Sequence, residues 1–100
     1  MARYDVVTLI SESPKAHGVH EIPKYKERTV YCTVRSASMQ EVYASAASGL
    51  KPELKFTLTV AEEYKGERLC RHQGVLYDVI RVYTAGGKIE LTVQRSGASV

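Results

Sequence analysis

The sequence predicts a mainly β fold: a small antiparallel β-barrel of about six strands, with one short α-helix inserted between strands two and three. Apolar and polar residues alternate with a period of two in several short segments, as in strands with two unlike faces. Glycine-containing turns separate the later segments. One central segment instead has helical spacing between a capping signal and a glycine–proline stop. At 100 residues, with 44% hydrophobic residues, the chain is expected to form a single domain over residues 1–100.

The first two strands are predicted on either side of an irregular loop. Residues 5–12 (DVVTLISE) are rich in β-branched side chains and predict the first strand. Residues 13–24 contain two prolines and a glycine, and they predict a mobile loop. Residues 25–35 predict the second strand, because Val30, Cys32 and the valine at 34 alternate with polar or aromatic residues.

The helix is predicted between residues 38 and 50. Ser38 and Glu41 form an S-x-x-E capping box. Gly49 suits the left-handed conformation that ends a helix, and Pro52 prevents its continuation. Because a helix this short is marginal alone, we expect it to pack on the sheet and to plug an end or cover a side of the barrel. The predicted packing stripe is Met39, Val42, Tyr43, Ala46, Ala47 and Leu50.

The second half of the chain predicts a series of hairpins. Residues 53–60 alternate, so that one face holds Leu54, Phe56, Leu58 and Val60. Turns at Lys65-Gly66, Gln73-Gly74 and Gly86-Gly87 separate three further strands, the last of which aligns Ile89, Leu91 and Val93. Residues 96–100 are predicted to be a frayed tail. Closing these strands into a barrel would remove the open edges of the sheet.

Composition and motifs argue against several classes of function. The formal net charge of +3 is spread over interleaved acidic and basic residues, which gives little reason to expect binding to nucleic acid or membranes. We find no pattern typical of a metal site, a cofactor site or a catalytic site, so we expect no enzyme activity. Cys32 and Cys70 are expected to be buried thiols, with a disulfide as the alternative. No signal peptide or membrane span is recognisable, which predicts an intracellular, soluble chain.

Tyrosine is overrepresented, with seven tyrosines against one phenylalanine and no tryptophan. Tyrosines at the surface of a barrel are typical of protein interfaces, because each offers apolar area and a polar tip. They could also stack on bases, with Arg71, Arg81 and Lys88 to contact phosphates. A third reading is that they only cap the rim of the core. The diluted positive charge favours a protein interface over nucleic-acid binding.

The central segment has the pattern Ser38…Tyr43-x-x-Ala46-Ala47-x-Gly49-Leu50-Lys51-Pro52-Glu53-x-x-Phe56. It is preceded by YDVVTLI and followed by EEYKGERLCRHQGVLYDVIRVY and KIELTV. In order and spacing these motifs resemble the head-closure proteins (head–tail adaptor or joining proteins) of tailed bacteriophages and prophages. The resemblance covers about residues 4 to 95. The loop at residues 13–24 departs from it, because it shows no pattern that matches the family.

The resemblance implies a structural protein of the virion neck. Such subunits assemble in the bacterial host cytoplasm into a ring, usually twelve-fold in the virion, whereas the isolated subunit can be monomeric. The ring lies below the portal and its adaptor, closes the DNA channel after packaging and provides the surface where the tail docks. The implied partners are therefore copies of the same chain, portal or adaptor proteins and tail proteins, with transient contact to packaged DNA. Neither a cofactor nor a membrane is implied.

Three sets of residues are expected to matter on this view. The helix face with Gln40, Ser45 and Ser48, together with Lys51, is expected to be exposed and to contact a neighbouring subunit or ring. The loop with His17, His20 and Lys24 is expected to line the channel or contact a partner, although a loop tip without a role is the alternative. The fold is expected to depend on Ser38, Glu41, Tyr43, Gly49, Leu50, Pro52 and Phe56. The alternative function is a small β-barrel module that binds single-stranded nucleic acid.

Overall fold

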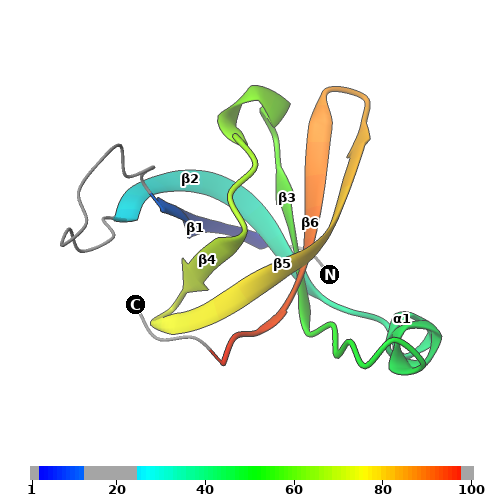
Figure 1. Cartoon of the computed structure of the whole chain (residues 1–100). Coiled ribbons are helices and arrows are strands. Elements are labelled where there is room, and N and C mark those ends of the chain that lie inside the picture. Colours follow the sequence, from blue (N-terminus) through cyan, green and yellow to red (C-terminus); the bar gives the residue numbers. More distant parts are fainter. Residues whose placement is uncertain (1–2, 13–24, 98–100) are drawn as a thin grey trace, which may run out of the picture.

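The chain folds into six strands and one short α-helix, as the computed structural model of the protein shows for residues 3–12 and 25–97 (Figure 1). The helix α1 lies between the second and third strands, as predicted. A short 3₁₀ turn, η1 (Ala61–Glu63), follows the third strand. The remaining elements are β1 (Arg3–Glu12), β2 (Tyr25–Ser36), α1 (Met39–Ala46), β3 (Leu54–Leu58), β4 (Leu69–His72), β5 (Val75–Ala85) and β6 (Lys88–Arg95).

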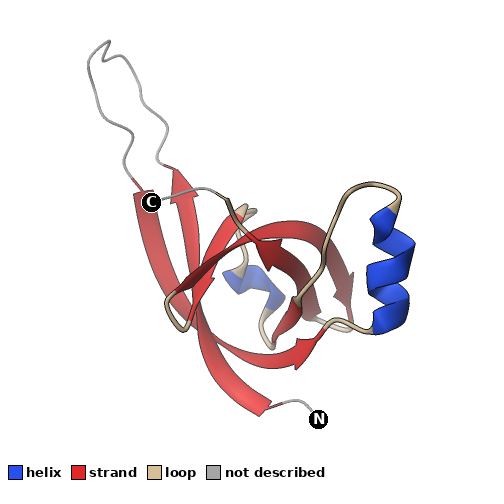
Figure 2. Ribbon diagram, turned by 90° about the horizontal axis from the view of Figure 1, so that it is seen from below, coloured by secondary structure: helices blue, strands red, loops and turns tan. Residues whose placement is uncertain are grey.

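The strands form a closed antiparallel barrel in the order β1-β2-β3-β6-β5-β4 (Figure 2). Closure comes from pairing between β1 and β4, where Leu9 lies opposite Cys70. Each strand therefore has a neighbour on both sides, although two of the pairings are short: β1 meets β4 over residues 8–10, and β2 meets β3 over residues 32–36. The predicted fold class is confirmed.

The core of the barrel is built by the alternation that the sequence shows. Phe56 and Leu58 on β3 are fully buried, whereas the intervening Thr57 lies on the outer face. Val60 was predicted to continue this inward face, and this prediction is wrong. The chain leaves the sheet after Leu58, and Val60 is exposed at the start of η1. The buried core comprises Val7, Leu9, Val30, Cys32, Phe56, Leu58, Cys70, Tyr77, Ile89, Leu91 and Val93.

Two of the three predicted hairpin turns are present. The third, at Lys65-Gly66, is not a hairpin turn: Gly66 has a positive φ of 88°, but β3 and β4 on either side of it are not neighbours in the sheet. Gly86 and Gly87 join β5 to β6 with φ angles of 60° and 77°, and the flanking Ala85 and Lys88 pair with each other. Two successive residues with positive φ suit the right-handed twist of the strands that they join, and glycine adopts this geometry without steric cost. The Gln73-Gly74 turn has the same pattern, with φ angles of 51° and 79°.

The predicted tail and the predicted loop lie partly or wholly outside the residues that the structure describes. The predicted tail begins at Ser96, but the amide of Ser96 donates a hydrogen bond to the carbonyl oxygen of Leu76 at 3.0 Å, so Ser96 is not frayed. Residues 98–100 lie outside the described residues, and so does the predicted loop at 13–24 with His17, His20 and Lys24.

Both cysteines are free and fully buried, as predicted. Burial raises the pKa of each thiol to about 12, because an apolar environment disfavours the thiolate. A nearby carboxylate adds to the effect at Cys32. At neutral pH both thiols are therefore uncharged core residues with little nucleophilic character.

Candidate assembly surface

The helix α1 projects from the barrel instead of covering it. Figures 1 and 2 show it beside the barrel, joined to β2 and β3 by its two connecting segments. No strand packs along its length. The prediction that the helix plugs an end or covers a side of the barrel is therefore wrong. The two ends of the helix and the polar contacts around them must account for its position.

The N-terminus of α1 is fixed by the predicted capping box. The Ser38 hydroxyl accepts a hydrogen bond from the Glu41 amide at 3.2 Å, and the Glu41 carboxylate accepts one from the Ser38 amide at 2.8 Å. Two backbone donors that have no partner within the helix are thereby satisfied.

The C-terminus ends as Gly49 predicts. Gly49 has φ 74°, its amide donates to the carbonyl oxygen of Ala46 at 3.0 Å, and the Leu50 amide donates to that of Ser45 at 3.2 Å. This pair of bonds is a Schellman motif. After Gly49, Leu50 is half-buried and Pro52 is buried. The chain then returns to the barrel, where the Glu53 amide donates to the carbonyl oxygen of Val93 at 2.8 Å.

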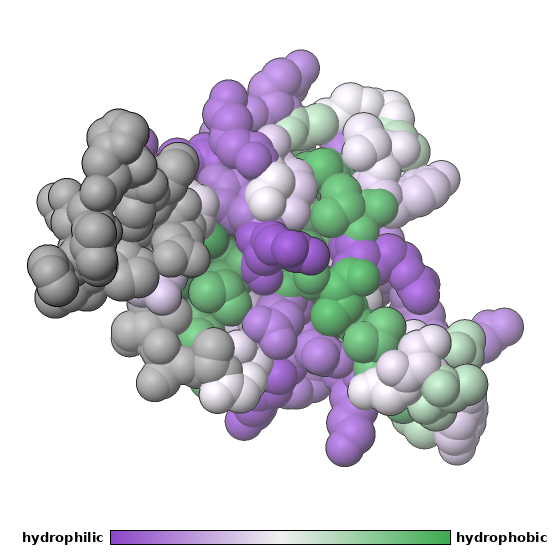
Figure 3. All heavy atoms as spheres, in the orientation of Figure 1, coloured by the Kyte–Doolittle hydropathy of each residue, from purple (hydrophilic) through white to green (hydrophobic). Residues whose placement is uncertain are grey.

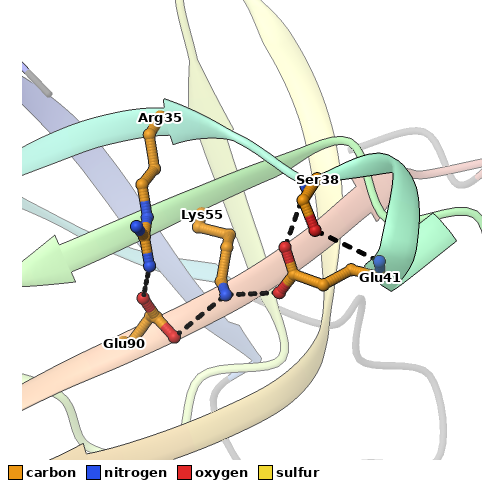
Figure 4. Close-up of polar contacts among 5 residues, drawn as sticks. All are labelled: Arg35, Ser38, Glu41, Lys55 and Glu90. Atoms are coloured by element: carbon orange, nitrogen blue, oxygen red, sulfur yellow. Dashed lines mark hydrogen bonds and ion pairs between the residues drawn. The ribbon is translucent and has the colours of Figure 1, made fainter. Parts of the chain in front are cut away.

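A polar clamp of four side chains, Arg35, Glu41, Lys55 and Glu90, ties the first turn of α1 to the barrel (Figure 4). The Lys55 ammonium lies between the Glu41 carboxylate and the Glu90 carboxylate, 3.3 Å from the latter. Arg35 donates to the other oxygen of Glu90 at 2.8 Å. The Lys55 side chain is only 12% exposed, so it needs both carboxylates to compensate for lost hydration.

The clamp determines which face of α1 points outward. Glu41 is held against β3, and this brings Val42 and Ser45 to the barrel side. Ser45 was predicted to be exposed, but only 4% of it is, so that prediction is wrong. Tyr43 was predicted to pack in the interior, but it is 72% exposed. The predicted apolar stripe is therefore divided: Val42 and Leu50 are half-buried, whereas its other four residues are exposed.

The result is an uncovered apolar surface, the outer face of α1, formed by Met39, Tyr43, Ala46 and Ala47. Met39 is 62% exposed. In Figure 3 the protrusion that α1 forms is mostly pale green and white, beside a barrel surface on which purple and green areas are mixed. Exposed apolar residues gathered on one protruding element are typical of a protein interaction site.

The other predicted contact residues lie around this face. Gln40 and Ser48 are exposed, as predicted. Lys51 is also exposed, and its amide donates to the Gln94 side-chain oxygen at 2.8 Å. Sequence reasoning missed Lys55 and Glu90, which belong to strands far along the chain from α1. Their outward positions on β3 and β6 were visible in the alternation, but their proximity to Glu41 was not.

The residues expected for nucleic-acid binding are only partly available. Arg71 donates to the Glu27 carboxylate at 2.6 Å, so its charge is already paired. Arg81 and Lys88 are exposed on the β5–β6 hairpin, near the exposed Tyr83. Two of the three cations expected to contact phosphates thus lie near one exposed aromatic ring.

We expect the clamp to control the position of α1 independently of the stability of the barrel. In Lys55→Met the two carboxylates lose their shared cation, so α1 should lose its fixed orientation while the barrel stays folded. Hydrogen exchange should become faster at amides of residues 39–50 and stay slow in β1, β2 and β6. The matched control is Lys51→Met, which replaces an exposed lysine nearby. It should change hydrogen exchange neither in residues 39–50 nor in the barrel strands. Equal loss of protection throughout the barrel would contradict this role.

The attachment of α1 should also depend on pH. Hydrogen bonding to Lys55 and to the Ser38 amide lowers the pKa of Glu41 from 4.5 to about 2. A carboxyl group with a lowered pKa stabilises the folded form above its unfolded value, and this contribution is lost as the pH falls. Protection of the first turn of α1 should therefore persist at pH 5 and decline between about pH 4.5 and 2. In Glu41→Gln the decline should be absent, since the variant has no carboxyl group to titrate there.

Comparison with known proteins adds no family assignment, because no family model matches the chain and no curated protein matches it. Within the described residues, no helix is long and apolar enough to cross a membrane.

Proposed function

We propose that the protein is a structural subunit of a phage or prophage neck: a ring below the portal and adaptor that closes the DNA channel and receives the tail. The observation that carries the proposal is the outer face of α1, an apolar surface on a projecting helix whose first turn a polar clamp fixes to the barrel. This face belongs to the same segment that resembles the head-closure proteins. An apolar surface on a rigid projection is what a subunit needs in order to join a larger assembly.

The closed barrel supports the same proposal from another direction. Since every strand has a neighbour on both sides, closure limits the unpaired backbone to parts of strands, such as residues 3–7 of β1 on the side of β4. Side-chain surfaces offer a contact between subunits that does not need such an edge. The outer face of α1 is such a surface, and it holds no charged residue that would have to lose its hydration.

The test is deletion of the gene from its parent phage or prophage, followed by electron microscopy of the lysate. We expect packaged heads that have lost DNA, beside complete tails that are not attached. Complementation with Tyr43→Arg should fail, because it places a charge in the outer face of α1. Complementation with Tyr83→Arg, an equally accessible tyrosine on β5, should succeed. Normal virions from the deletion strain would reject the neck function.

The alternative is a small barrel that binds single-stranded nucleic acid, and Tyr83, Arg81 and Lys88 are the exposed residues that favour it. It predicts affinity for oligonucleotides that falls steeply with salt. Loss of that affinity in Arg81→Ala/Lys88→Ala, with no assembly defect, would support it over the neck function.

A further inference from the structure

A second uncovered apolar surface lies on the outside of β1 and β2. This tyrosine face consists of Tyr4, Val6 and Tyr31, of which Tyr4 is 82% and Tyr31 75% exposed. Val6 and Tyr31 lie opposite each other in the β1–β2 pairing, and Tyr4 lies opposite Thr33. The three side chains therefore share one face and border a common shallow pocket. Tyr4 and Tyr31 neither cap the core nor pack inside the barrel, whereas Tyr77 lies in the core and Tyr64 packs against it.

The charged side chains at the margin of the tyrosine face have partners. Asp5, which also lines the pocket, lies within hydrogen-bonding distance of the His72 Nε2 atom, at 2.8 Å. Thr8 and Thr29 lie on the same face and share a hydrogen bond at 3.0 Å between their hydroxyl groups. The charged side chains beyond them, Arg71 and Glu27, pair with each other at 2.6 Å. A partner that covers the tyrosine face would therefore not bury any of these charges without its counter-charge or hydrogen-bond partner. Tyr83 differs in this respect, because Arg81, Lys88 and Glu90 surround it.

The outer face of α1 has the same chemical character. Between its N-terminus and Ala47, the outward residues are apolar or neutral, and the acidic Glu41 is held in the clamp on the barrel side. An apolar helix face packed on an apolar sheet face is one of the stable ways in which protein layers combine. Tyrosine and methionine are also enriched at the centres of protein interfaces.

We propose that α1 of one copy docks on the tyrosine face of a second copy. This inference rests on the proposed function and specifies how neighbouring subunits meet. The two surfaces consist of different residues on different elements, one on α1 and the other on the outside of β1 and β2. The contact is therefore heterologous: each copy gives its helix to one neighbour and its tyrosine face to another. Repetition of such a contact generates a ring when the rotation closes.

Cysteine cross-linking tests the contact directly. The natural Cys32 and Cys70 are buried and do not interfere. In the double variant Met39→Cys/Tyr31→Cys, oxidation of the purified chain at high concentration should give a ladder of dimers and larger species. Each single variant should stay monomeric, since a head-to-tail contact never brings two copies of the same residue together. Met39→Cys/Tyr83→Cys is the matched control and should give no ladder.

A charge exchange provides an independent measurement. Tyr31→Arg or Tyr43→Glu alone should weaken self-association at least about tenfold, as expected for a central interface residue. The double variant should recover much of the loss, because its arginine and glutamate then meet across the contact. Circular dichroism should show all three folded, since both positions are exposed.

The outcomes separate the proposed contact from the proposed function. Disulfide dimers from a single variant would mean a two-fold contact and would overturn the head-to-tail arrangement. Absence of a ladder together with unchanged association in Tyr31→Arg would overturn the contact altogether. If the ladder forms but the gene deletion gives normal virions, the contact stands and the neck function fails. If the deletion gives detached tails without any ladder, the neck function stands and its subunits meet through other surfaces.

Discussion

Replacing Phe56 with alanine is expected to lower the free energy of unfolding by about 3–5 kcal/mol. Phe56 is fully buried at the centre of the barrel. The centroid of its ring lies 5.1 Å from that of the His72 ring and 6.3 Å from that of the Tyr77 ring, and the contact with Tyr77 is edge-to-face. On the sheet it pairs with Val34 on β2 and with Leu91 on β6, so its removal opens a cavity where three strands meet. A domain of this size is stable by only about 5–15 kcal/mol in total.

Urea denaturation followed by circular dichroism measures this loss. Tyr43→Ala is the matched aromatic control: because Tyr43 is exposed on α1, its replacement should change the free energy of unfolding by less than about 0.5 kcal/mol. A variant Phe56→Ala that unfolds at nearly the wild-type urea concentration would show that the barrel can collapse around the missing ring.

Replacing Glu67 with alanine is expected to lower the free energy of unfolding by about 2 kcal/mol. The Glu67 carboxylate is buried between η1 and β4, where it accepts hydrogen bonds from Arg28 at 2.5 Å and from the Lys65 amide at 2.8 Å. Its loss leaves both donors without this partner. The expected cost is smaller than for a fully buried ion pair, because the Arg28 side chain is 38% exposed and can be rehydrated in part.

The same contacts give this site a pH dependence. Burial alone would raise the pKa of Glu67, but the hydrogen bonds from Arg28 and from the Lys65 amide outweigh burial and lower it below 4.5. The carboxylate therefore stabilises the fold above about pH 4.5, and that contribution is lost as the pH falls further. Comparison of urea midpoints at pH 7 and pH 3 should show a smaller pH effect in Glu67→Gln than in the wild type. Glu62→Gln, at an exposed position in η1, should behave like the wild type.

The helix shows where prediction from sequence succeeds and where it stops. Both of its ends were predicted correctly, because Ser38, Glu41 and Gly49 act on backbone groups within three to five residues of themselves. The outward orientation of Tyr43 was not predicted. Periodicity shows that apolar residues share one face, but it does not show whether that face meets the core or the solvent.

The sequence by itself determined the strands, their turns, the helix and most of the core, since these follow from alternation, glycine positions and capping signals that are local in the chain. Only the tertiary structure decided that α1 stands away from the barrel and that Ser45 is covered while Tyr43 is exposed. The orientation of the helix depends on the clamp. Lys55 on β3 pairs with Glu41 and Glu90, which come from α1 and from β6. The tertiary fold brings these three charges together, and no local pattern in the sequence predicts that they are in contact.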